Sequence, residues 1–72
     1  MPEKPTARRI RQAGETQAAL ARVKADPSAE SIAALHRVHA RHLREIGDPA
    51  GAAEADARAE RVLALAPPPE DD

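Results

Sequence analysis

Apolar residues recur along this 72-residue chain at spacings of three and four, which is the spacing of one face of an α-helix. Residues 27–46 carry one such stripe, formed by Ile32, Leu35, His39, Leu43 and Ile46. Residues 49–66 carry a second stripe of mostly small side chains, formed by Ala52, Ala55, Ala59, Val62, Leu63 and Ala66. Residues 7–25 carry a weaker stripe that polar residues interrupt. The pattern predicts an all-α chain of three helices.

Cap and turn residues set the boundaries of these helices. Asp26-Pro27 and Asp48-Pro49 each place a capping carboxylate before a proline at the first helical position, where its missing N–H costs nothing. Gly47 supplies the left-handed conformation that ends the middle helix. The short turn between the last two helices makes them antiparallel. We therefore predict a helical hairpin formed by residues 27–46 and 49–66.

The whole chain, residues 1–72, is expected to form one small helical domain with flexible tails at residues 1–5 and 67–72. Residues 7–25 form a third helix, which either completes a three-helix bundle on the hairpin or enters the bundle of a partner. In the hairpin the two stripes are expected to face each other. This places His39 at the centre of the interface, opposite Ala59.

The chain has little material for a core. It contains 18 alanines, no aromatic residue and no cysteine. Burying a large aliphatic side chain contributes roughly 1.5–3 kcal/mol, whereas ordering one residue costs about 1.5 kcal/mol. We therefore expect the chain to associate with a protein partner or with itself. Three apolar residues remain outside the predicted interface and are candidate interaction residues: Val23, Val38 and Leu65.

Charge and hydropathy narrow the choice of partner. The net charge is −1, but the first third of the chain is basic and includes Arg8, Arg9 and Arg11. These arginines are candidate contacts for a charged partner, including the phosphates of a nucleic acid. Without aromatic residues the chain cannot stack on bases, so we expect a protein partner rather than nucleic acid. No apolar run is long enough for a membrane helix, and the expected compartment is the cytoplasm.

His36, His39 and His42 are the sequence feature that could carry chemistry. Residues three apart are neighbours on a helix, and imidazole is a ligand for zinc, nickel and copper. The three histidines spread over about 120° of the helix, so a second copy or a carboxylate such as Glu45 would have to complete a metal site. The alternatives are a packed core histidine at position 39 and a pH-sensitive packing switch. The hydroxyl residues lack the neighbours that a nucleophile needs, so neither an enzyme nor a cofactor is expected.

Residues 33–67 resemble a single tetratricopeptide-type repeat, a helix–turn–helix unit with small residues at fixed positions. Ala40, Ala52 and Ala59 match those small positions, and Gly47-Asp48 matches the turn. The aromatic positions of the family depart from the pattern, since they fall on His36, Leu43 and Asp56. The resemblance implies a protein-binding role without catalysis.

The leading interpretation is a non-catalytic interaction, adaptor or structural module that acts through helix–helix association. One alternative is a metal-binding or pH-sensing protein that uses its histidines. Another is a small nucleic-acid-associated regulator that uses the basic first helix.

Overall fold

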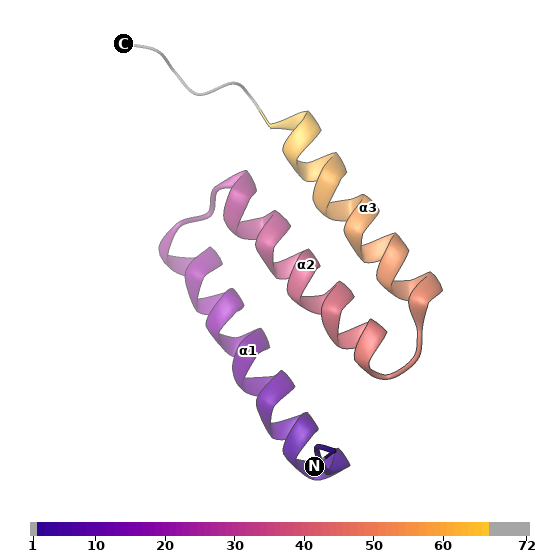
Figure 1. Cartoon of the computed structure of the whole chain (residues 1–72). Coiled ribbons are helices and arrows are strands. Elements are labelled where there is room, and N and C mark those ends of the chain that lie inside the picture. The colour runs from indigo at the N-terminus through magenta and orange to yellow at the C-terminus, as the bar shows by residue number, and fades with distance from the viewer. Residues whose placement is uncertain (1, 67–72) are drawn as a thin grey trace.

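The computed structural model describes residues 2–66, which form three α-helices joined by short connections (Figure 1). Helix α1 spans Pro5–Ala25, α2 spans Ala29–Glu45 and α3 spans Pro49–Leu65. The described residues contain no strand, which confirms the all-α prediction. The predicted C-terminal tail, residues 67–72, lies outside the described residues.

The first two helices begin at different residues from those predicted. Helix α1 begins two residues early because Pro5 is itself acceptable in the first helical turn. Helix α2 begins two residues late because Ser28 is its N-cap and accepts a 3.2 Å hydrogen bond from the backbone N–H of Ser31. Asp26 instead accepts hydrogen bonds from the hydroxyls of Ser28 and Ser31, at 3.1 and 3.2 Å.

The turn between α2 and α3 follows the prediction. Gly47 has a φ of 83°, a left-handed conformation that costs other residues about 1–2 kcal/mol. Asp48 caps α3, with its side chain accepting a 3.0 Å hydrogen bond from the N–H of Gly51. The N–H of Asp48 donates to the carbonyl of Leu43 at 2.8 Å and so satisfies one of the last carbonyls of α2. The predicted antiparallel hairpin is therefore confirmed.

Alanine side chains form the interface between α2 and α3, which we call the alanine seam. Each of its five members is at most 1% exposed: Ala33, Ala40, Ala52, Ala55 and Ala59. Leu43 is partly buried and packs against this cluster. Small side chains let two helix backbones approach closely, so the seam leaves no room for larger residues between the helices.

The three helices lie side by side in a single layer with α2 in the middle (Figure 1). Helix α2 packs against both neighbours, whereas no Cα atom of α1 lies within 8 Å of a Cα atom of α3. No helix among the described residues covers the two broad faces of α2, and each face carries a groove between neighbouring helices.

The prediction that His39 faces Ala59 at the centre of the hairpin is wrong. His39 is exposed, and Ala40, the next residue, is fully buried in the alanine seam. One residue corresponds to a rotation of about 100° around a helix. The stripe of large residues on α2 therefore lies on a broad face of the layer, where Ile32, Leu35 and Leu43 are half-buried and Ile46 is 56% exposed. The buried histidine is His42, on the side of α2 that faces α1.

The alanine seam predicts that the free energy of unfolding depends steeply on the size of the side chains at its positions. Ala52→Leu should lower the free energy of unfolding by about 1–3 kcal/mol, because extra methylene groups in a close-packed interface force the helices apart. Ala53→Leu is the matched control, since Ala53 is exposed on the same helix. Urea denaturation followed by circular dichroism measures both variants. Equal stabilities for the two would contradict the close approach of α2 and α3.

Candidate functional site

A cluster of charged and polar side chains joins α1 to α2, with Glu15 at its centre. His42 donates from Nε2 to Oε1 of Glu15 at 2.9 Å, and Arg41 donates to Oε2 at 2.8 Å. Arg11 lies one turn before Glu15 on α1 and donates to Oε1 at 2.9 Å. Glu15 therefore accepts from both helices, and we call the group the Glu15 cluster. Sequence reasoning missed Glu15, although its i,i+4 spacing from Arg11 is a visible signal.

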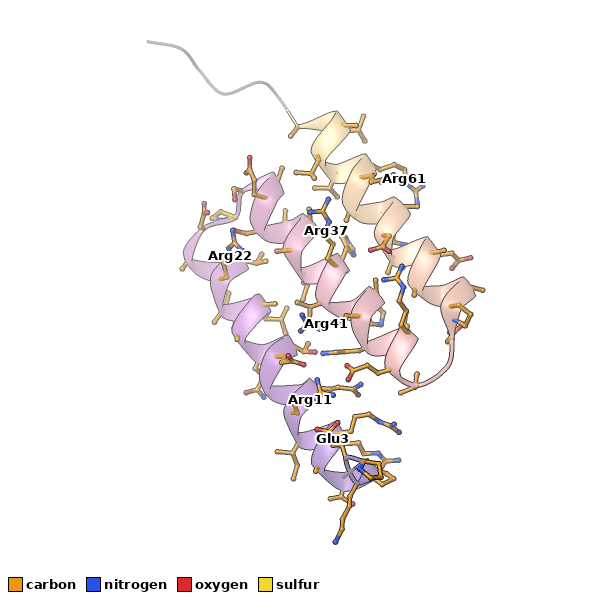
Figure 2. The ribbon with its side chains drawn as sticks, viewed as in Figure 1. Glu3, Arg11, Arg22, Arg37, Arg41 and Arg61 are labelled. Carbon is orange, nitrogen blue, oxygen red and sulfur yellow. The ribbon has the colours of Figure 1, made fainter. Side chains whose placement is uncertain are left out.

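Arg11 extends this cluster to the end of the helix pair where α1 begins and α2 ends. Its guanidinium donates to the two carboxylate oxygens of Glu3 at 2.9 Å, and Figure 2 shows both side chains at the N-terminal end of α1. It also donates to Glu45 in the last turn of α2. Planar guanidinium groups suit such forked contacts with carboxylates. Arg11, predicted as a partner-binding residue, is thus engaged within the chain.

These contacts lower the pKa of each of the three carboxylates in the cluster. The hydrogen bond from His42 lowers the pKa of Glu15, and the charges of Arg41 and Arg11 lower it further. The hydrogen bond from Arg11 lowers the pKa of Glu45, and the same arginine lowers the pKa of Glu3. All three carboxylates are therefore held in the charged form that the contacts require.

The Glu15 cluster is also where the described residues could offer ligands to a metal ion. Glu15, His42 and Glu45 each place one ligand atom within 4.8 Å of the other two. Arg11 contacts both carboxylates, so a cation would have to displace its guanidinium. The structure does not bring the three predicted ligands together: His42 faces α1, while His36 and His39 line a groove on the open face. Metal binding stays a prediction.

The open face of α2 carries the stripe of large residues. A groove of about 360 Å³ crosses all three helices there, between Leu20 of α1, Leu35 and His39 of α2, and Arg58 of α3. Helix geometry places Ile32, Leu43 and Ile46 on the same side of α2 as His39. We call this surface the apolar face; it comprises Leu20, Ile32, Leu35, His39, Leu43 and Ile46.

The opposite face of the layer is positively charged. Arg22, Arg37 and Arg41 surround a groove of about 420 Å³ that also contains Glu30, and Figure 2 shows these arginines along α1 and α2. Its floor includes the predicted interaction residue Val38. The other predicted interaction residues are scattered: Arg8 and Val23 are half-buried, Arg9 is exposed and Leu65 is 83% exposed.

Comparisons with protein-family models, curated proteins and solved structures gave no match for this chain. Within residues 2–66, no helix has both the length and the apolar character needed to cross a membrane. The function must therefore be inferred from the geometry of the open layer.

The Glu15 cluster predicts that α1 detaches in acid. A carboxylate whose folded pKa is lowered stabilises the fold above its unfolded pKa, which is near 4.5, and loses this contribution as the pH falls through the folded value. Unfolding free energy should therefore fall as the pH drops below about 4.5. Denaturation by urea at pH 3–7, followed by circular dichroism, measures this dependence.

Glu15→Gln keeps the size of the side chain and removes its charge, so it should weaken the acid dependence. Glu54→Gln on exposed α3 is the matched control, because no ion pair to Glu54 is found within residues 2–66. An identical pH profile for native protein and Glu15→Gln would contradict the role assigned to Glu15.

Proposed function

We propose that this chain is a non-catalytic protein-interaction module that works through helix–helix association across its apolar face. The single-layer arrangement carries this proposal. Helix α2 buries alanines against α3 and polar groups against α1, while Leu35 and Leu43 stay half-buried on the open face and Ile46, just past its end, is 56% exposed. Apolar surface gathered on one face marks an association site more often than apolar residues that are scattered singly.

The shape of the apolar face suits a helix as the binding element. Its α2 residues follow the spacings of three and four that place side chains in one row along a helix. An incoming helix can set its own row of apolar side chains against this row, as in other helix-in-groove complexes. The groove between Leu20 and Arg58 runs across the row and offers space for one anchoring side chain.

The resemblance to a tetratricopeptide-type repeat supports the same proposal. Its three small positions, Ala40, Ala52 and Ala59, are the fully buried members of the alanine seam. Its turn position, Gly47-Asp48, joins the two helices. Repeats of that kind cannot bury their apolar surface alone and stack on neighbouring helices to do so. An adaptor that receives a helix on an open hairpin face fits this pattern.

Site-specific photo-crosslinking in the native cell tests the proposal. A photoreactive phenylalanine analogue at Leu35 should capture a protein, because Leu35 lies in the groove of the apolar face. The matched control places the same analogue at Arg61, which is exposed on the outer edge of α3 (Figure 2). The proposal predicts a defined crosslinked band from position 35 and none from position 61. No band from either position, or equal bands from both, would contradict it.

A further inference from the structure

The order of side chains in the α2 stripe is symmetric about its central residue. His39 is at its centre, Leu35 and Leu43 lie four residues to either side, and Ile32 and Ile46 lie seven residues to either side. Residue type and spacing are therefore both symmetric about position 39. None of the five side chains carries a carboxylate, an ammonium or a guanidinium group. Such a row is complementary to a copy of itself that runs in the opposite direction.

We propose that a second copy of this chain covers the apolar face, with the two α2 helices antiparallel and the two His39 residues at the two-fold axis. This inference rests on the proposed function and names its partner. In this arrangement Leu35 of one copy meets Leu43 of the other, and Ile32 meets Ile46. An interface built on a two-fold axis uses the same surface of both copies, which the stripe satisfies.

The chain's own core buries few large apolar side chains, which favours a permanently bound second copy that covers the apolar face. The largest fully buried side chain in the described part of the chain is that of Ser31. No large aliphatic residue is fully buried there: Ile32 and Leu35 are half-buried, and Ile46 is 56% exposed, so part of their apolar surface is still uncovered. A second copy of the chain would bury this remaining apolar surface, and another copy is present wherever the protein is made.

Electrostatics favour the antiparallel over the parallel arrangement. Each α2 helix carries partial positive charge at its N-terminus and partial negative charge at its C-terminus, so antiparallel neighbours place opposite ends together. A parallel pair would instead place like ends of the two helix dipoles together. At the axis, two neutral imidazoles can pair, because each offers one donor and one acceptor nitrogen.

The remaining charge at this face does not oppose the second copy. Arg58 lies in the groove beside His39. Its long aliphatic stem can lie along apolar surface while its guanidinium stays in water at the edge of the interface. The paired layers would form a two-layer helical assembly in which the apolar rows become a shared core, the usual way in which helical faces are buried.

Cysteine crosslinking tests the arrangement, because the chain contains no native cysteine. His39→Cys should form a disulfide-linked dimer with itself, since the two-fold axis brings these positions together. Arg37→Cys is the matched control, since Arg37 lies in the groove of the opposite face. Under mild oxidation, His39→Cys should crosslink at least about tenfold faster than the control, because a pre-formed interface holds the thiols at high effective concentration.

Two further variants fix the direction of the helices. Positions 32 and 46 are about 21 Å apart along α2 at 1.5 Å per residue. In the antiparallel dimer, Ile32→Cys and Ile46→Cys should therefore crosslink when mixed, while each alone should not. Crosslinking of Ile32→Cys with itself would show a parallel pair and overturn the proposal. Circular dichroism of each variant confirms that its helices remain intact.

The outcomes separate this inference from the proposed function. Crosslinking of His39→Cys no faster than Arg37→Cys overturns the second copy as the partner. If photo-crosslinking at Leu35 then captures a different protein, the interaction function stands with another partner. If that experiment also captures nothing, both proposals fail.

Discussion

The close contact between α2 and α3 through the alanine seam is the constraint on which the rest of the structure depends. Two helices that meet through alanines gain little apolar burial for each residue but approach closely. Ala40 and Ala52 therefore fix which side of α2 faces α3, and of the larger α2 side chains Leu43 packs at the edge of the seam. Because α1 packs on the opposite side of α2 from α3, the other large side chains of α2 can lie only on the two broad faces of the layer. The apolar face follows directly from this choice of small residues.

The two neighbours of α2 are held by different forces. Helix α3 is held by shape and by a short turn, whereas α1 has no buried residue and is held largely by the Glu15 cluster. Exposed ion pairs contribute little individually and weaken with salt. The attachment of α1 therefore depends on solution conditions in a way that the hairpin does not. A second layer across the apolar face would contact Leu20 as well as α2 and would hold α1 in place.

Local features of the fold could be predicted from the sequence, whereas the side of α2 that packs against α3 could not. Gly47 and Asp48 define the turn through backbone conformation and capping, which act within a few residues. For α2, we assumed that its largest apolar residues would face α3, and this placed His39 rather than Ala40 in the interface. The assumption failed because small residues compete for the closest contact. The Glu15–His42 pair joins residues 27 positions apart, so it depends on packing that local patterns do not specify.

Sedimentation equilibrium of the native chain tests the central claim most directly, because it measures whether the open layer exists alone. The account predicts a mass of twice the 7.7 kDa of one chain at micromolar concentrations and neutral pH. Leu35→Glu places a charge in the apolar row and should return the mass to that of a single chain. A helical native chain that sediments at 7.7 kDa throughout, even at millimolar concentrations, would contradict the pairing of two copies.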